Sequence, residues 1–237
     1  MDFNLEQRMD WIIEYTRGFE KVVVGASGGK DSSVVLALCV KALGAERVIA
    51  VTMPCSSNPT DAEHAKLVSD AFGVELITVD LKDTFDTLKN TIGSATTLSD
   101  LGIANIKPRL RMTTLYAIAQ ANNALVVGTD NLSEMVMGYF TKWGDGGYDI
   151  NPLSDLTVSE VLAFGKVLGV PAPILEKPPS AGLWEGQTDE NEMGVTYDEV
   201  EEFIKTGATN ERAQQIIERA NKISKHKREM PYCFSSK

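Results

Sequence analysis

Eight consecutive residues, Gly25-Ala-Ser-Gly-Gly-Lys-Asp-Ser32, combine the residue types that bind a phosphate group. A glycine-rich loop between a strand and a helix presents backbone N–H groups, and the helix N-terminus adds positive potential. Asp31 at the mouth of this loop would repel a phosphate unless a cation lay between them, and Mg²⁺ commonly takes that place. The alternative is that Asp31 only stabilises the helix dipole. The first interpretation predicts a phosphate loop that works with a metal ion.

Two familiar phosphate motifs do not fit this loop. A Walker A loop has five positions between its first glycine and its lysine, followed by serine or threonine. Here four positions separate Gly25 from Lys30, and Asp31 follows. A dinucleotide fingerprint needs glycine where this chain has Ser27. Transfer of a γ-phosphate, the chemistry of kinases, is therefore disfavoured.

The loop is expected to lie in a fold in which strands and helices alternate. Apolar runs predict strands at residues 21–26, 47–53, 75–79, 124–129 and, in a short form, 148–150. Helical patterns are found at residues 32–43, 61–72, 83–90, 108–122, 131–137, 157–168, 197–205 and 210–225. This order predicts an α/β fold: a doubly wound, Rossmann-like parallel sheet of five strands with helices on both faces, in a single domain over residues 1–237. Ligands of such sheets bind at the carboxyl ends of the strands.

Two segments, residues 93–107 and 169–194, have weak periodicity and many small residues, glycines or prolines. Loops of more than about 12 residues are uncommon in compact domains unless they serve a function. We therefore expect both segments to be mobile loops that close over a bound ligand and exclude water.

The composition limits the class of partner. The chain has 237 residues and a formal net charge of −10, which argues against broad binding to nucleic acid or to a membrane surface. No apolar run is long enough to span a bilayer, and the three cysteines show no CxxC spacing, which suits the reducing cytoplasm. Basic residues cluster at positions 107–111 and 222–228, either as solvated faces or as landing places for an anionic small molecule.

The loop motif resembles the SGGxDS loop of the ATP pyrophosphatases, which cleave ATP between the α- and β-phosphates and adenylate a substrate oxygen. Further blocks resemble the NAD synthetase family, in that family's order and over nearly the whole chain. These blocks are RLRM at 109–112, GTDNLSE at 128–134, GYFTKWGDG at 138–146, KPPSAGLWEGQTDE at 177–190 and HKR at 226–228, followed by Pro231.

The resemblance implies ATP-dependent amidation of deamido-NAD (nicotinic acid adenine dinucleotide) with ammonia, the last step of NAD biosynthesis. An NAD-adenylate forms as pyrophosphate leaves, and ammonia then converts it into NAD and AMP. ATP is the implied co-substrate, Mg²⁺ the implied metal and a homodimer the implied assembly. Free ammonia is the expected nitrogen donor, because relatives that use glutamine carry an amidase domain ahead of the synthetase and only about twenty residues precede the first strand here.

The resemblance also implies roles for individual residues. The ATP-binding positions are Gly25, Ala26, Ser27, Gly28, Gly29, Lys30, Asp31, Ser32, Thr129 and Ser180. The metal ligands are Asp31 and Glu134, and these two residues are catalytic together with Asp145. The deamido-NAD-binding positions are Arg109, Lys142, Asp149, His226 and Lys227.

Several of these residues have a purely structural alternative. Glu134 would pair with Asn131 in a capping box at a helix start. Thr129 would only end a strand, and Asp145 would belong to a turn. The alternative for His226 and Lys227 is a frayed basic helix end, favoured by the helix dipole.

The chain departs from the family pattern at two positions. Lys30 stands where the family usually has an uncharged residue, and Val158 stands where it usually has a lysine that contacts the nucleotide phosphates. We hypothesise that Lys30 supplies the charge that Val158 does not. The alternative is that Lys30 faces solvent beside the loop.

Two other functions remain to be weighed. Another adenylating enzyme of the pyrophosphatase group, such as one that modifies tRNA, is disfavoured by the acidic balance of the chain. A regulatory module that binds ATP without chemistry is disfavoured because such a sensor needs no pair of metal ligands like Asp31 and Glu134.

Overall fold

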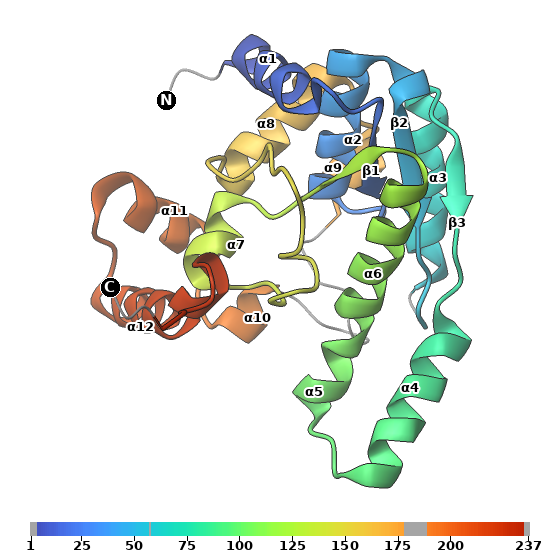
Figure 1. Cartoon of the computed structure of the whole chain (residues 1–237). Coiled ribbons are helices and arrows are strands. Elements are labelled where there is room, and N and C mark those ends of the chain that lie inside the picture. The colour runs from blue at the N-terminus through green and yellow to red at the C-terminus, as the bar shows by residue number, and fades with distance from the viewer. Residues whose placement is uncertain (1–3, 57, 178–188, 235–237) are drawn as a thin grey trace.

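The computed structural model describes residues 4–56, 58–177 and 189–234, and these form a sheet of four parallel strands. The strands are β1 (Lys21–Gly25), β2 (Val48–Thr52), β3 (Leu76–Thr78) and β4 (Ala124–Val127), in the order β3-β2-β1-β4. Strand β1 lies between β2 and β4, and Figure 1 shows it beside β2. The parallel sheet confirms the predicted α/β class.

The predicted fifth strand at residues 148–150 is not formed. This segment makes a single bridge between Val127 and Ile150. The Asp149 carboxylate accepts the Val126 N–H at 2.8 Å, and the Asp149 N–H donates to the Val126 carbonyl at 2.9 Å. A side chain therefore takes the place of a continuing ladder, and the glycines at 144, 146 and 147 turn the chain just before it.

The sheet is covered on both faces, as the doubly wound prediction requires. Alternate residues of β1 point to opposite sides, with Val22 and Val24 in one apolar cluster and Val23 in another. The first face packs against α1 (Leu5–Thr16), α2 (Lys30–Leu43), α3 (Pro59–Phe72), α8 (Val158–Leu168) and α9 (Ala172–Leu175). The second packs against α4 (Lys82–Ala95) and α6 (Ile106–Ala121). Within the described residues, no helix has the length and apolar character needed to cross a membrane.

A third apolar cluster lies beyond the sheet, around the C-terminal helices (Figure 1). It joins α7 (Leu132–Met137), α10 (Asp189–Met193), α11 (Tyr197–Thr206) and α12 (Glu211–Arg228). Val158, the first residue of α8, also belongs to it, together with Tyr197. Because α7 follows β4 and α8 packs on α2, this cluster adjoins the carboxyl ends of the strands.

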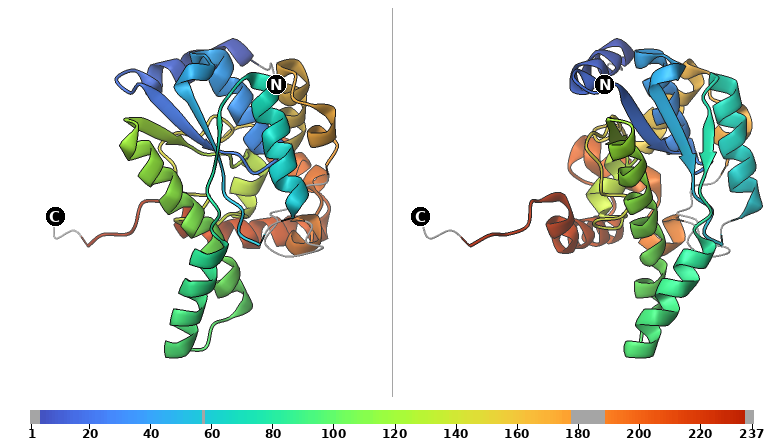
Figure 2. Two further views of the ribbon diagram at one scale, coloured as in Figure 1. Left: turned by 90° about the vertical axis from the view of Figure 1, so that its right-hand side faces the viewer. Right: turned by 45° about the vertical axis from the view of Figure 1, so that its right-hand side comes forward.

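The prediction of a mobile loop at residues 93–107 is wrong. Helix α4 continues to Ala95, α5 (Asp100–Ala104) follows, and α6 begins at Ile106. The Ser99 hydroxyl caps α5 by accepting the Gly102 N–H at 3.1 Å, and isoleucines 92, 103 and 106 pack into the second apolar cluster. Apolar residues are sparse in this segment, so its helical periodicity is weak in the sequence. Figure 2 shows that the helical arm formed by α4, α5 and the start of α6 extends away from the sheet. The expected loop at 169–194 contains α9 and α10, and residues 178–188 lie outside the described part.

Candidate active site

The phosphate loop is held in shape by its own serines. The Ser27 and Ser32 hydroxyls lie 2.9 Å apart, and the Ser32 hydroxyl donates to the Gly29 carbonyl at 3.1 Å. Ser33 donates to the same carbonyl at 2.7 Å. The Ser27 and Gly29 N–H groups donate to the Ser32 and Ser27 hydroxyls, both at 3.3 Å, and the loop joins the end of β1 to the start of α2, so the helix N-terminus lies at the carboxyl ends of the strands. This geometry is that of an anion site.

Gly28 allows the loop to pass close to α3. Its φ of +75° lies in the left-handed region, and a Cβ there would lie 2.3 Å from the Asp61 carbonyl oxygen and 2.9 Å from the His64 Cβ. Only glycine satisfies both the backbone conformation and the close approach. The Asp61 carboxylate pairs with the Lys177 ammonium at 2.5 Å, next to the start of the undescribed segment. Ser180, a predicted ATP contact, lies in that segment, outside the described residues.

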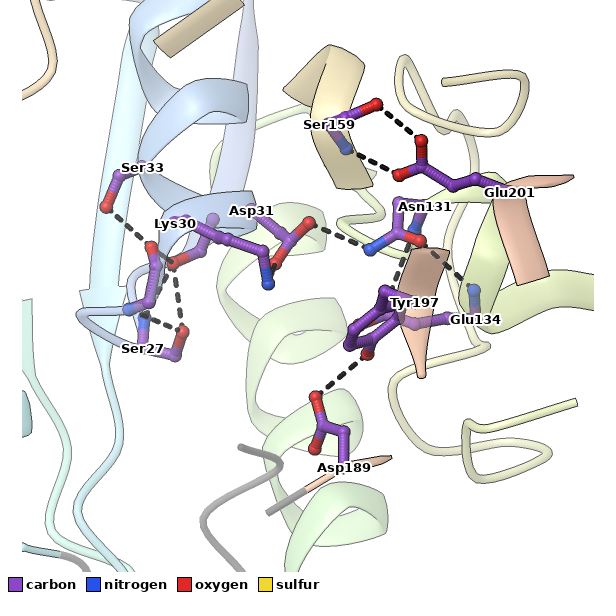
Figure 3. A network of polar contacts seen from close by, with 12 residues as sticks. Ser27, Lys30, Asp31, Ser33, Asn131, Glu134, Ser159, Asp189, Tyr197 and Glu201 are labelled. Atoms are coloured by element: carbon purple, nitrogen blue, oxygen red, sulfur yellow. Dashed lines mark hydrogen bonds and ion pairs between the residues drawn. The ribbon is translucent and has the colours of Figure 1, made fainter. Parts of the chain in front are cut away.

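Asn131 connects the two predicted metal ligands. Its side-chain amide donates to the Asp31 carboxylate at 3.0 Å, and its backbone N–H donates to the Glu134 carboxylate at 2.9 Å (Figure 3). The Glu134 N–H returns a bond to the Asn131 side chain at 3.0 Å, so the predicted capping box is present. The capping role therefore coexists with a position beside Asp31, and the buried Asn131 is a site residue that the sequence interpretation did not single out.

The donor set suits a hard divalent cation that also binds phosphate. Burial and then the charge of Asp31 raise the pKa of Glu134 well above its usual range, so a cation between these carboxylates would relieve their repulsion. Within the described ranges, no three His, Cys, Asp or Glu side chains gather into a complete metal site. Two carboxylates with the remaining ligands from phosphate and water are typical of Mg²⁺. The residues present therefore fit the implied metal.

Lys30 faces inward, which excludes the solvent-facing alternative. Its side chain is 6% exposed, and its ammonium lies 3.0 Å from the Asp31 carboxylate. Burial alone would lower the pKa of Lys30, but the carboxylates of Asp31 and Glu134 outweigh burial and raise it. Lysine is rarely buried without a charged partner, and the Asp31 carboxylate is that partner for Lys30.

Asp130 is a second residue that the sequence interpretation missed. It lies between Thr129 and Asn131, is 5% exposed, and its Oδ2 atom is buried without a hydrogen-bond partner among the described residues. Burial, followed by the charges of Asp145 and Asp31, raises the pKa of Asp130 well above its usual range. The available signal was its position directly after an apolar strand, where a polar residue reaches the ligand-binding edge of the sheet.

Asp145 belongs to a turn, and its carboxylate also lies near that of Asp130. Its carboxylate accepts the Thr141 N–H at 2.7 Å, as a turn residue would. Asp145 as a whole is exposed, but partial burial of its carboxyl group raises its pKa, and the Thr141 N–H opposes this effect. The charge of Asp145 repels that of Asp130, which shows that the two segments after β4 lie close enough for their carboxylates to interact.

Four of the predicted substrate-binding residues form a second group. The Arg109 guanidinium donates to the Lys142 carbonyl at 3.4 Å, and the Lys142 ammonium donates to the His226 carbonyl. The Lys227 ammonium donates to the carbonyls of Gly138 and Phe140, at 2.7 and 2.6 Å. These positively charged side chains thus link α6, residues 138–147 and the end of α12. Burial lowers the pKa of Lys227.

Asp149, the fifth predicted substrate residue, is engaged elsewhere. Besides the Val126 N–H, its carboxylate accepts the Tyr116 hydroxyl at 3.0 Å, on the outer side of β4. Thr129, a predicted ATP contact, lies two residues beyond β4 and is half-buried. The structure thus joins Asp31 of the loop and Glu134 through Asn131, two residues after Thr129, whereas Asp149 is bound along the outer side of β4.

A phosphate loop at the carboxyl edge of a doubly wound parallel sheet, faced by paired carboxylates, defines the class of nucleotide-binding α/β proteins. Within that class, residues 4–231 match the NAD synthase family model. The chain belongs to the NAD synthase family.

Curated relatives agree with this assignment over almost the full length. The chain is 44% identical over 230 residues to an NH(3)-dependent NAD(+) synthetase of Carboxydothermus hydrogenoformans, which covers 95% of this chain and 94% of the relative. It is 45% identical over 238 residues to the Alkaliphilus oremlandii protein of the same name, which covers 96% and 95%.

Solved structures share the fold. The structure of NMN synthetase from Francisella tularensis has a TM-score of 0.90 and 36% identity, and covers 98% of this chain and 99% of that one. An NH3-dependent NAD synthetase from Campylobacter jejuni has a TM-score of 0.81 and 27% identity, with coverage of 99% and 100%.

Proposed function

We propose that this chain is an ammonia-dependent NAD synthetase, a ligase that amidates deamido-NAD at the cost of ATP. Membership of the NAD synthase family and the names of the curated relatives support this function. The single observation that carries it is the Asn131 bridge, which holds the carboxylates of Asp31 and Glu134 together at the mouth of the phosphate loop. A loop that merely bound a nucleotide would not need this pair.

The first step is adenylation of the substrate carboxylate. A nicotinate carboxylate oxygen attacks the α-phosphorus of ATP, the bond to the bridging oxygen breaks, and pyrophosphate leaves with that electron pair. The loop N–H groups around Ser27 and Gly29 and the start of α2 would hold the phosphates and stabilise their growing charge. Asp31 and Glu134 would hold Mg²⁺, which when bound neutralises phosphate charge and orients the pyrophosphate.

The second step is attack by ammonia on the NAD-adenylate. The nitrogen lone pair adds to the carbonyl carbon, the bond to the AMP oxygen breaks, and the nitrogen loses a proton as the amide forms. We place Asp145 beside the ammonia, because its carboxylate and that of Asp130 lie close enough to interact; they would attract an ammonium ion and accept the proton that it loses before its nitrogen attacks. Adenylation is required because a free carboxylate has no adequate leaving group.

The remaining predicted contacts follow from charge and position. Arg109, Lys142, His226 and Lys227 are proposed to hold the two phosphates of deamido-NAD, since cations on three segments suit an extended dianion. Asp149 is proposed to accept from its sugar hydroxyls. Thr129 and Ser180 are proposed to contact ATP.

One reaction mixture tests the proposed function. Purified protein with ATP, Mg²⁺, deamido-NAD and ammonium should form equal amounts of AMP, pyrophosphate and NAD. Formation of ADP, or of no AMP, would contradict it, and AMP formed without deamido-NAD would indicate another substrate. Glutamine in place of ammonium, in ammonia-free buffer, should give no comparable turnover.

Nicotinate mononucleotide is a second candidate substrate. The observation that favours it is the TM-score of 0.90, at 36% identity, with a structure titled NMN synthetase. Both substrates would be adenylated at the same carboxylate by the same loop. A comparison of kcat/KM for the mononucleotide and the dinucleotide decides between them, and we expect the dinucleotide to be preferred.

We further propose that the chain forms a homodimer. On and just after α1, the apolar side chains of Ile13, Tyr15 and Phe19 are 42%, 53% and 38% exposed, and a second copy would cover part of this surface. Sedimentation velocity tests the assembly: an active monomer at assay concentration would refute it.

A further inference from the structure

The Lys30 side chain points toward the carboxylate of Asp31, one of the two predicted metal ligands, in Figure 3. Its ammonium lies 3.0 Å from Oδ2 of Asp31, while Oδ1 of Asp31 accepts the Asn131 amide at 3.0 Å. Both oxygens of the predicted metal ligand are therefore engaged by the protein itself. A cation that binds Asp31 through Oδ2 would compete with the Lys30 ammonium, because two positive charges on one oxygen repel each other.

The surroundings of Lys30 explain why it stays inside. The ammonium lies 5.8 Å from the centre of the Tyr197 ring, within the range of a cation–π contact. The Tyr197 hydroxyl donates to the Asp189 carboxylate at 2.9 Å, and Glu134 faces the same space. Three carboxylates and an aromatic face thus surround one positive charge, which links the phosphate loop to α10 and α11.

We propose that Lys30 is a tethered cation, which holds the Asp31 carboxylate before the metal binds and moves to the nucleotide phosphates afterwards. This inference rests on the proposed function, because it assigns the metal and the phosphates to this site. Its physical basis is the reach of the lysine side chain: Lys30 starts α2, so a change of side-chain rotamer carries its ammonium from Asp31 toward the loop N–H groups. The charge then remains in the site and acts on the pyrophosphate as it leaves.

The first test is metal binding without any nucleotide, with Mn²⁺ as the probe and free Mn²⁺ measured by electron paramagnetic resonance. Lys30→Met removes the competing charge and keeps the length of the side chain, so Mn²⁺ should bind about tenfold more tightly than to the wild type. Lys30→Arg restores the charge and should return the affinity to within about threefold of the wild type.

Lys177→Met is the matched control for this titration. Lys177 forms a comparable ion pair, with Asp61 beside the same loop, but does not contact Asp31. Its loss should leave the Mn²⁺ affinity within about twofold of the wild type. Equal tightening in both Met variants would reveal a general charge effect and overturn the proposal, as would unchanged or weaker Mn²⁺ binding in Lys30→Met.

The second test measures whether the Lys30 ammonium binds the nucleotide phosphates. With saturating Mg²⁺, calorimetric titration of a non-hydrolysable ATP analogue should give about tenfold weaker binding to Lys30→Met than to the wild type, because the displaced ammonium then binds the phosphates. Unchanged nucleotide affinity would overturn the transfer to phosphate. Neither titration contains deamido-NAD or measures turnover, so a wild type that fails to make NAD would overturn the proposed function while the result for Lys30 stood.

Discussion

Two regions of the site differ in how the hydrogen bonds of their polar side chains are satisfied. These are the phosphate loop and the basic group, which is formed by Arg109, Lys142, His226 and Lys227. The loop is built from contiguous residues, and its serines bond to one another and to Gly29. The basic group comes from three distant segments, and its cations donate to backbone carbonyls. The loop is thus formed before any ligand arrives. The basic group has to exchange carbonyl contacts for ligand phosphates, so its substitutions should affect both stability and substrate binding.

The largest effect is expected at the two metal ligands. Asp31→Asn and Glu134→Gln each keep the shape of the side chain and remove one negative charge, so kcat should fall by about 100-fold or more. The midpoint of thermal unfolding should stay within about 5 °C of the wild type for Glu134→Gln, because its Asn131 bonds survive, and should fall further for Asp31→Asn, which also removes the charged partner of the buried Lys30. Product formation and calorimetry check the two quantities. Turnover near the wild-type rate at low Mg²⁺ would remove these residues from the metal site.

The next effect concerns the prebuilt shape of the loop. Gly28→Ala meets both a φ of +75° and the Asp61 carbonyl at 2.3 Å, so ATP affinity should fall by about tenfold or more. Gly73→Ala is the matched control, with a φ of +67° and no atom within 4 Å of the new Cβ. It should cost about 1 kcal/mol of unfolding free energy and leave ATP affinity unchanged. Equal ATP affinities in the two variants would show that the close packing on α3 has no bearing on nucleotide binding.

These expectations show how far the sequence itself could lead. The loop was predictable because its chemistry is local: glycines, serines and Asp31 stand together between a β-branched run and a helical pattern. Four of the five predicted strands form, since continuous apolar runs encode buried parallel strands. The fifth failed because a side-chain carboxylate, Asp149, occupies the ladder position, and no periodicity encodes such a substitution.

The tertiary contacts of the site were beyond the sequence for a related reason. Asn131 carries an ordinary capping signal, and its bond to Asp31 joins residues 100 positions apart. The buried Asp130 looked like any polar residue after a strand. The inward direction of Lys30 depends on Tyr197 and Asp189, which only the packing of α10 and α11 brings near the loop.

A smaller effect should distinguish the basic group. Lys227→Met removes the donors to the Gly138 and Phe140 carbonyls, which should lower the free energy of unfolding by about 1–2 kcal/mol. KM for deamido-NAD should rise by about tenfold while KM for ATP stays within about twofold, because the loop lies apart from these contacts. Urea unfolding and steady-state kinetics measure both. A loss of stability with unchanged KM values would make Lys227 purely structural.

The smallest effect is on the pH dependence of stability. Because the pKa of Asp130 is raised in the folded state, folded protein keeps a proton that the unfolded chain releases above a pH of about 4. Stability is therefore lost as pH rises from there toward the raised pKa. Asp130→Asn should flatten this fall, so that metal-free urea unfolding favours the variant more at pH 8 than at pH 5. A constant difference between the two proteins at both values would contradict the assignment.

Asp149 has a consequence for how copies of this chain behave at high concentration. Strand β4 is an edge strand, and an edge with free N–H and carbonyl groups is a template for pairing with another molecule, the first event in β-aggregation. Here the Asp149 carboxylate and backbone occupy both polar groups of Val126, and the Gly128 N–H donates to the Ile150 carbonyl at 2.7 Å. The opposite edge, β3, is only three residues long. The Asp149 carboxylate at one edge and the short strand at the other leave little surface for intermolecular sheet growth. Asp149, which the family resemblance implies as a contact for sugar hydroxyls, should therefore also hinder fibril formation.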